Sequence, residues 1–363
     1  MIEQTGICEK CRGVFDFTAV QLRRLITDHP DQFPMYTTHG RWDLSGEAWT
    51  NWCEGFLGGQ LWLVYLHTRD SWWREQAEHY ARLIEPRKTD RAVHDLGFLF
   101  WPTWKRWYDL TGDPAVQAVL IEAGRTLSIR FNEKGKYLCS FLAPDSLFVD
   151  IMMNVGIIFY AAQQTNDQRL YDIALQHCLT SRRFLVRGDG STAHEGLFDL
   201  ASGEFLRQST QQGWRADSCW ARGLAWALYG FTTAYGFTRD ERFLNTARSC
   251  ADFYLSHVPG QGIPPNDFDE PEPRFPYESS AAAIAASGLL DLTRHSGSAH
   301  YREGALQILD TLTGSDFLAN KTLGWEGLLK HGIYHSRKGL GVDESVMWGD
   351  YFFLEAVGKV LDE

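Results

Sequence analysis

The sequence lacks the motifs that mark several large classes of enzyme. Its 363 residues contain no Gly-x-x-x-x-Gly-Lys loop, no Gly-x-Gly-x-x-Gly after a predicted strand, no Gly-x-Ser-x-Gly and no His-Glu-x-x-His. These motifs are the main sequence signs of phosphoryl transfer, dinucleotide binding, serine hydrolysis and zinc-dependent proteolysis. None of these four chemistries is therefore indicated.

Positive charge is also scarce. The chain has 35 lysine and arginine residues against 46 aspartate and glutamate residues, which gives a formal net charge of −11. Phosphate backbones are bound by basic patches, so we do not expect nucleic acid as a partner. An anionic small molecule would need an arginine, a histidine or backbone amides placed locally against the overall negative charge.

Long apolar runs are missing as well, and the N-terminus has no basic start followed by an apolar stretch. We therefore expect neither a membrane span nor a signal peptide. The seven cysteines are an odd number, and Cys8 and Cys11 have no second pair near them to complete a zinc site. We interpret the cysteines as reduced thiols of a cytoplasmic protein without a bound metal.

What the sequence does contain is a repeated pair of helices. An apolar helix ends at a short polar turn, and an amphipathic helix follows. Helices that are apolar on all sides are buried, whereas amphipathic helices have one face in water. The expected buried helices are 55–67, 95–110, 149–164, 218–236, 278–295 and 343–361.

The turns between the paired helices share a Thr-x-Asp pattern, with one looser Ser-Gly-Ser variant. They begin at Thr68, Thr111, Thr165, Thr238 and Ser296. The last buried helix has no successor, and the amphipathic segment 17–29 near the N-terminus is its expected partner. Six buried helices inside six outer ones predict an all-α fold, an (α/α)6 barrel of six helical hairpins. No alternating apolar–polar runs, which would indicate strands, compete with this helical fold. No linker divides the chain, so we expect a single catalytic domain over residues 1–363.

Polar residues gather in the loops that lead into the buried helices. In a barrel of parallel inner helices these loops meet at one end, where helix N-termini favour an anionic ligand. The expected contributors are Trp52–Glu54, His94–Asp95, Phe148–Asp150, Asp217–Ser218, Tyr277–Glu278 and Asp343–Glu344. This end of the barrel is the predicted site.

Asp150 and Asp95 are the two candidates for acid–base chemistry. Each stands at the start of a buried helix, so each is either a helix cap or a working carboxylate. The apolar neighbours of Asp150 are expected to desolvate it, which would raise the pKa of its carboxyl and keep it protonated near neutral pH. If both carboxylates face one cavity, their charges should push the two pKa values apart.

A second group of residues is predicted to support these carboxylates and to bind the ligand. Arg222 lies one turn into an apolar helix, where a buried guanidinium needs a protein carboxylate or an anionic substrate as its partner. The sequence does not decide between these two partners. Trp52 and Trp226 are positioned to stack on a sugar face, and His194 and Gln212 are expected nearby.

At these residues the sequence resembles the unsaturated glucuronyl hydrolases of glycoside hydrolase family 88. The ordered blocks that carry the resemblance are 94–98, 149–154, 181–189, 212–226, 279–285 and 348–351. The resemblance implies an (α/α)6 barrel that hydrolyses unsaturated uronyl oligosaccharides released by polysaccharide lyases. It implies Asp150 as general acid and base, assisted by Asp95, with no cofactor. It also implies a sugar site lined by Trp52, His94, His194, Gln212, Arg222 and Trp226.

Three alternatives stay open beside this reading. They are an unsaturated rhamnogalacturonyl hydrolase, a sugar epimerase or isomerase on the same barrel, and a glycan-binding barrel without catalysis. An epimerase would need a pair of acid–base histidines at the barrel mouth, which the sequence does not suggest. The expected partner is a small anionic oligosaccharide, and the protein is expected to be a monomer or homodimer. Arg337 and Lys338 are candidates for a contact with a second sugar.

Overall fold

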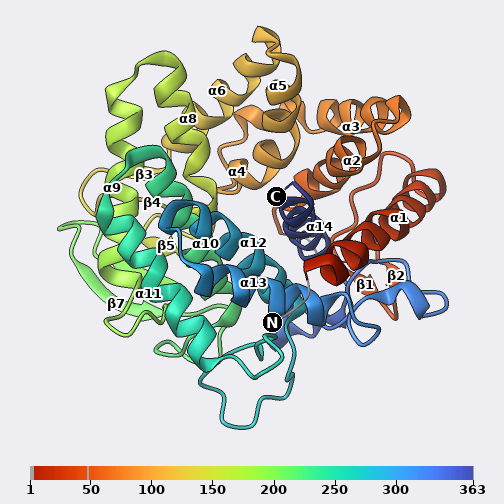
Figure 1. Ribbon diagram of the computed structural model, residues 1–363. Coiled ribbons are helices and arrows are strands. Elements are labelled where there is room, and N and C mark those ends of the chain that lie inside the picture. The colour runs from red at the N-terminus through yellow and green to blue at the C-terminus, as the bar shows by residue number, and fades with distance from the viewer. Residues whose placement is uncertain (1–3, 47–48, 363) are drawn as a thin grey trace.

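The computed structural model describes residues 4–46 and 49–362. Six inner helical segments surround the centre of the molecule, and the chain follows this ring in sequence order (Figure 1). The inner segments are α2 (Glu54–Thr68), α4 (Leu96–Phe100) continued through a π-helical turn (Trp101–Lys105) into α5 (Arg106–Thr111), α7 (Ile151–Asn154) with α8 (Gly156–Thr165), α10 (Ala221–Thr238), α12 (Ser279–Ser296) and α14 (Met347–Leu361). Contacts between neighbouring segments close the ring from α14 back to α2.

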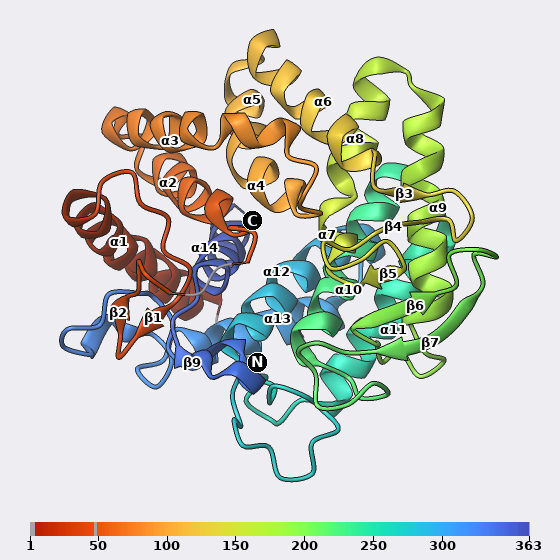
Figure 2. The same cartoon turned by 180° about the vertical axis from the view of Figure 1, so that it is seen from behind.

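Six amphipathic helices pack outside this ring. They are α1 (Gln4–Asp28), α3 (Ser71–Leu83), α6 (Pro114–Ser128), α9 (Gln168–Leu185), α11 (Glu241–His257) and α13 (Ala299–Leu312). Helix α1 contacts α14, as expected for the partner of the last inner helix. The predicted (α/α)6 barrel is confirmed, and both views show the outer helices at its periphery (Figures 1 and 2).

The polar turns end the inner helices and begin the outer ones as predicted. The residue after each of the first five inner helices takes the left-handed conformation, at Arg69, Gly112, Asn166, Arg239 and Gly297. The aspartate after the first four accepts a hydrogen bond from a backbone N–H of the outer helix, through Asp70, Asp113, Asp167 and Asp240. Such side-chain caps satisfy backbone donors that a helix start leaves unpaired.

Two inner helices are interrupted, which the sequence did not lead us to expect. Pro102 has no N–H to donate, and the chain passes through the π-helical turn there. A second break lies at Val155, between α7 and α8. Beside it, the Asn154 side chain accepts the N–H of Phe98 at 2.8 Å and donates to the carbonyl of Asp150 at 3.2 Å. A Cβ atom on Gly97 would lie 2.5 Å from the Cα of Asn154, so only glycine permits this close approach.

Short strands are also present, which no alternating apolar–polar run in the sequence had indicated. Over residues 4–46 and 49–362, nine antiparallel strands lie in the loops: β1 (Thr37–Thr38), β2 (Arg41–Trp42), β3 (Phe131–Asn132), β4 (Tyr137–Leu138), β5 (Ser146–Phe148), β6 (Glu195–Phe198), β7 (Phe205–Ser209), β8 (Gly332–His335) and β9 (Leu340–Glu344). Strands of two to five residues are too short to show an alternating pattern. The β5–β6 pairing matters for the site, because Val149 donates to the carbonyl of His194 at 3.0 Å and so places His194 beside Asp150.

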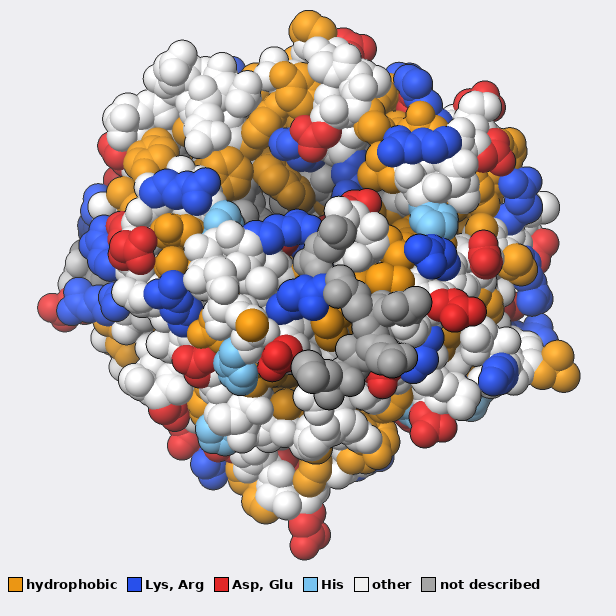
Figure 3. All heavy atoms as spheres, in the orientation of Figure 1, with side chains coloured by type: hydrophobic (Ala, Val, Ile, Leu, Met, Phe, Trp, Pro, Cys, Tyr) orange, Lys and Arg blue, Asp and Glu red, His pale blue; other side chains and the backbone are white. Residues whose placement is uncertain are grey.

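Charged side chains of both signs are mixed over the face shown in Figure 3. The excess negative charge is therefore not gathered into one acidic patch on this face. Over residues 4–46 and 49–362, no helix combines the length and the apolar character needed to cross a membrane.

Candidate active site

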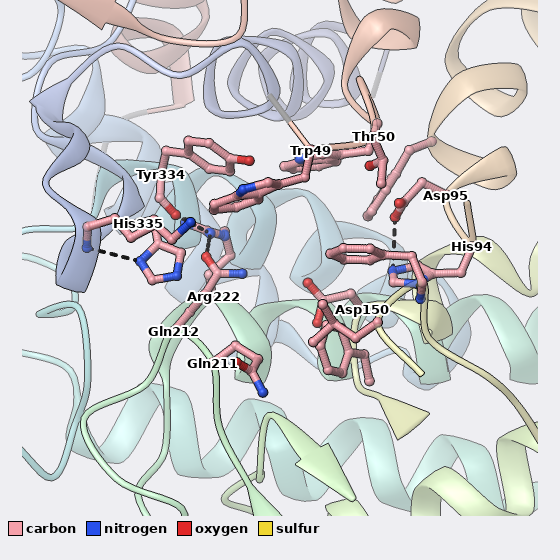
Figure 4. A pocket seen from close by; sticks show the side chains of 16 residues that line it. Trp49, Thr50, His94, Asp95, Asp150, Gln211, Gln212, Arg222, Tyr334 and His335 are labelled. Carbon is pink, nitrogen blue, oxygen red and sulfur yellow. Dashed lines mark hydrogen bonds and ion pairs between the residues drawn. The ribbon is translucent and has the colours of Figure 1, made fainter. Parts of the chain in front are cut away.

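A pocket of about 840 Å³, counting the open space at its mouth, lies where the loops into the inner helices meet. Six of the predicted site residues line it: Trp52, His94, Asp95, Asp150, Gln212 and Arg222. Other lining residues include Trp49, Phe141, Phe148, Gln211, Tyr334 and His335. Figure 4 shows Asp95 and Asp150 on one side of this central pocket, and Arg222, Tyr334 and His335 on the other.

Two predicted ligand-binding residues do not line the central pocket. Trp226 is fully buried, and its ring packs against Phe98, which does line the pocket, and against Phe352. His194 is also buried, between the rings of Phe148 and Trp220. The prediction of direct stacking by Trp226 is therefore corrected: its helix position turns the indole into the barrel core.

The loops before α10, α12 and α14 do not bring their predicted acidic residues into the pocket. Asp217 is exposed and pairs with Arg215 at 2.7 Å. Glu278 is buried at the start of α12, where it caps the helix. Asp343 is exposed and pairs with His331. The loops before α2, α4 and α7 supply some of their predicted residues to the pocket, namely Trp52, His94, Asp95, Phe148 and Asp150.

Neither Asp95 nor Asp150 caps its helix. Asp95 precedes α4 and Asp150 precedes α7, yet neither side chain accepts a hydrogen bond from the backbone of its helix. The aspartates that start outer helices all do so, as Asp113 shows by accepting from Ala115 at 2.8 Å. The helix-cap interpretation of Asp95 and Asp150 is thus wrong, and both carboxylates are available to the pocket.

His194 faces Asp150 directly. Its Nδ1 accepts a hydrogen bond from the N–H of Gln211 at 3.1 Å, so in the neutral ring the proton is on Nε2. Nε2 lies 3.5 Å from Oδ2 of Asp150, and neither of these two atoms has another hydrogen-bond partner. The imidazole therefore presents an N–H or a positive charge to the carboxylate.

His94 is placed in the same way beside Asp95. Its Nδ1 accepts from the N–H of Phe141 at 2.9 Å, which leaves Nε2 as the protonated nitrogen. Nε2 lies 3.2 Å from Oδ1 of Asp95. Each of the two carboxylates is thus paired with one buried histidine whose ring orientation is fixed by a backbone amide.

The pKa of Asp150 is shifted in the direction opposite to our expectation. Burial alone would raise the pKa of this carboxyl, as its apolar sequence neighbours suggested. His194 opposes this effect through its hydrogen bond and its electrostatic attraction to the carboxylate, and His94 and Arg222 add smaller electrostatic contributions. Together they outweigh burial and hold the pKa of Asp150 below its usual range. Without a bound substrate, Asp150 is therefore ionised near neutral pH.

Arg222 forms the positive wall of the pocket. Its guanidinium donates to the carbonyls of Ile333 and Tyr334 and, at 2.5 Å, to Oε1 of Gln212. It lies 4.5 Å from the ring of Trp220 and 5.1 Å from that of Trp348. Among the described residues no carboxylate forms an ion pair with it, so the protein-carboxylate alternative is excluded there. Burial lowers the pKa of this guanidinium, and an arginine side chain keeps its positive charge in proteins.

Trp49, Gln211, Tyr334 and His335 are among the lining residues that were not identified as site residues from the sequence. Tyr334 and His335 come from β8, a strand too short to predict, and Gln211 is carried by the loop after β7. Burial, followed by the charge of Arg222, lowers the pKa of His335 to about 4. Their role becomes visible only when the loops are placed in space.

Comparison with known proteins agrees with this geometry. Residues 24–262 match the sequence model of Glycosyl Hydrolase Family 88. The chain belongs to this family. It is 34% identical over 320 residues to an unsaturated glucuronyl hydrolase of Formosa agariphila, which covers 85% of this chain and 80% of that protein. It is 31% identical to an unsaturated chondroitin disaccharide hydrolase of Streptococcus pneumoniae, over 85% of this chain and 81% of that protein.

The fold shows the same relationship. The structure matches that of an unsaturated glucuronyl hydrolase specific for heparin with a TM-score of 0.91 and 29% identity, covering 98% of this chain and 97% of that one. As a family 88 member the protein is a glycoside hydrolase. The family that the sequence resembles is thereby confirmed.

Proposed function

We propose that this family 88 enzyme hydrolyses unsaturated, 4-deoxy-4,5-ene glucuronyl oligosaccharides such as those released by polysaccharide lyases. The observation that supports this proposal is the arrangement of charged side chains in the pocket. Two helix-start carboxylates that cap no helix face a buried guanidinium that has no carboxylate partner. A substrate that carries both an acid group and a bond to be protonated fits this arrangement.

The substrate is a vinyl ether, because its C4–C5 double bond is conjugated with the ring oxygen. Asp150 gives a proton to C4, which leaves an oxocarbenium-like centre at C5. A water molecule then attacks C5, and Asp150 takes a proton from that water and so regains its own. The resulting hemiketal opens and releases the second sugar. One carboxyl group therefore serves as acid and then as base.

The remaining residues bind and orient the substrate in this proposal. Arg222 uses three donors on the protein, so two of the five donors of its guanidinium remain for the substrate carboxylate. Asp95 accepts hydrogen bonds from sugar hydroxyls, and Trp52 stacks on the sugar ring. His94 and His194 hold the two carboxylates, while Trp226 supports Phe98 from behind.

The low pKa of Asp150 in the empty pocket implies a change when the substrate binds. A substrate carboxylate beside Arg222 cancels positive charge that lowers the pKa of Asp150, and exclusion of water raises that pKa further. Binding thus moves Asp150 toward the protonated form that the first step needs. A larger fraction of Asp150 is therefore protonated at neutral pH in the enzyme–substrate complex than in the free enzyme.

This argument predicts a difference between two pH profiles. The profile of kcat/KM reports groups of the free enzyme, whereas that of kcat reports groups of the complex. We expect both kcat/KM and kcat to fall as the pH rises. The fall in kcat should occur at a higher pH than the fall in kcat/KM. His194→Gln should shift the basic limb of the kcat/KM profile to higher pH, because it removes the main group that lowers the pKa of Asp150. His177→Gln, a buried histidine outside the pocket, is the control; coincident wild-type limbs would contradict the argument.

The function itself is tested with lyase-generated unsaturated disaccharides. The conjugated double bond absorbs in the near ultraviolet, and hydration removes this absorbance. We expect wild-type protein to abolish it for at least one uronyl disaccharide in a panel that varies the linkage, the second sugar and its sulfation. A rhamnogalacturonyl substrate turned over in preference would favour that alternative. No turnover of any unsaturated uronide would leave an epimerase or a glycan-binding protein.

We also infer that the chain acts as one catalytic domain in the cytoplasm, as a monomer or homodimer. Contact between α1 and α14 joins the first helix to the last, which supports the single domain. All seven cysteines are free thiols, which supports a reducing compartment. Cell fractionation and sedimentation analysis test these two inferences.

A further inference from the structure

Glu278 is a fully buried carboxylate that the proposed reaction does not use. It stands before α12 and accepts hydrogen bonds from the N–H of Ala281 at 2.8 Å and from the hydroxyl of Ser280 at 2.7 Å. These contacts make it a helix cap. It also accepts, at 3.1 Å, the N–H of Ile333 in strand β8, 55 residues further along the chain. A helix cap alone does not need this last contact.

The other backbone group of Ile333 is held by a side chain as well. Its carbonyl accepts a hydrogen bond from Arg222, which also donates to the carbonyl of Tyr334 at 2.9 Å. Ile333 is thus fixed between the carboxylate of Glu278 and the guanidinium of Arg222. The next two residues of β8, Tyr334 and His335, form the pocket wall around Arg222 (Figure 4).

A second connection joins the same groups through α14. The indole N–H of Trp348 donates to the hydroxyl of Ser280 at 3.0 Å, and that hydroxyl donates to Glu278. The ring of Trp348 in turn packs on the guanidinium of Arg222. Glu278 therefore fixes two of the surfaces against which Arg222 is oriented: the β8 backbone and one of its two flanking indoles.

The charges are complementary as well. Two buried opposite charges that do not touch are separated here by Ile333, which turns its N–H to the anion and its carbonyl to the cation. Backbone dipoles in this orientation stabilise both charges in a site with little water. Burial lowers the pKa of Arg222, and the negative charge of Glu278 counters this effect.

We propose that Glu278 is a positioning residue, which holds strand β8 and thereby orients Arg222 for the substrate carboxylate. This inference rests on the proposed function of Arg222. Glu278 touches no substrate and moves no proton. Its loss should weaken substrate binding while leaving the proton transfer at Asp150 largely intact.

Two conservative variants separate the cap from the contact with β8. In Glu278→Asp the carboxylate is one methylene shorter, so it still caps α12 but no longer reaches the N–H of Ile333. We expect KM to rise about tenfold with kcat changed less than about threefold. Glu278→Gln keeps the reach and one acceptor oxygen, so we expect a KM within about threefold of wild type despite a lower melting temperature.

Amide hydrogen exchange of the segment 331–336 gives a readout that does not depend on activity. Exchange at Ile333 should be faster in Glu278→Asp and close to wild type in Glu278→Gln. The matched control is Asp350→Asn, a buried acid in α14 that accepts the N–H groups of Leu328 and Leu329, neither of which lines the pocket. Asp350→Asn should have a lower free energy of unfolding than wild type and an unchanged KM.

Each outcome of these experiments either supports the proposal or overturns it. A wild-type KM and unchanged exchange in Glu278→Asp would reduce Glu278 to a helix cap and overturn the proposal. An equal rise of KM in both variants would assign the effect to charge rather than to the Ile333 contact, and would also overturn it. If the wild-type protein turns over no unsaturated uronide, the proposed function fails, while the exchange comparison still decides whether Glu278 holds β8.

Discussion

Replacing Asp150 by asparagine is expected to lower kcat on an unsaturated uronyl disaccharide by about a thousandfold, within the usual range for loss of a general acid–base group. An asparagine amide has the same shape but neither gives a proton to C4 nor takes one from water. Substrate binding should persist, because Arg222, Gln212 and Trp52 are untouched. The measurement is the loss of near-ultraviolet absorbance at saturating substrate, with the dissociation constant from calorimetry.

The folded state should tolerate this change well. Asp150 accepts no hydrogen bond from its own helix, so Asp150→Asn removes no cap. Asp167→Ala is the matched control, because Asp167 caps α9 by accepting the N–H of Leu170 at 3.1 Å. The control should lower the free energy of unfolding by about 1 kcal/mol and leave kcat unchanged. A kcat in Asp150→Asn near that of wild type would refute the assigned role of Asp150.

The architecture was predictable because its signals are local. Each inner helix is apolar on all sides, and each Thr-x-Asp turn both ends one helix and caps the next, as at Arg69 and Asp70. These features depend only on residues close together in the chain. The short strands and the break at Val155 were missed because they depend on contacts with distant segments, such as that of Asn154 with Phe98. The break at Pro102 has a local cause, the missing N–H of proline, but the apolar pattern that continues around it predicted one uninterrupted helix.

The site was predictable in composition but not in its electrostatics. The apolar neighbours of Asp150 indicated a raised pKa, yet His194, which is 44 positions away in sequence, lies against the carboxylate and reverses the shift. The β5–β6 pairing that brings them together has no sequence signal of its own. In the same way, Trp226 shares a helix with Arg222, and only the packed barrel shows that its ring faces the core.

Arg222→Lys is expected to raise KM for the unsaturated disaccharide by about a hundredfold, equivalent to about 2.8 kcal/mol of binding energy. A lysine ammonium has three donors, and the three protein acceptors around Arg222 compete for all of them. Lysine also lacks the planar guanidinium, whose Nε–H and second Nη1–H remain for the substrate carboxylate. The change should fall mainly on KM, because Asp150 and its histidine remain in place.

The methyl ester of the substrate isolates this interaction from any general loss of structure. Wild-type enzyme should prefer the free acid over the ester, whereas Arg222→Lys should lose most of that preference, so the two changes are strongly non-additive. Arg106→Lys provides the control, since Arg106 pairs with Glu355 at 2.7 Å and does not line the pocket. It should lower stability and keep the wild-type preference for the acid. If the ester and the acid were equally good substrates of the wild-type enzyme, the substrate carboxylate would not lie against Arg222. The positive charge in the pocket wall would then need another explanation.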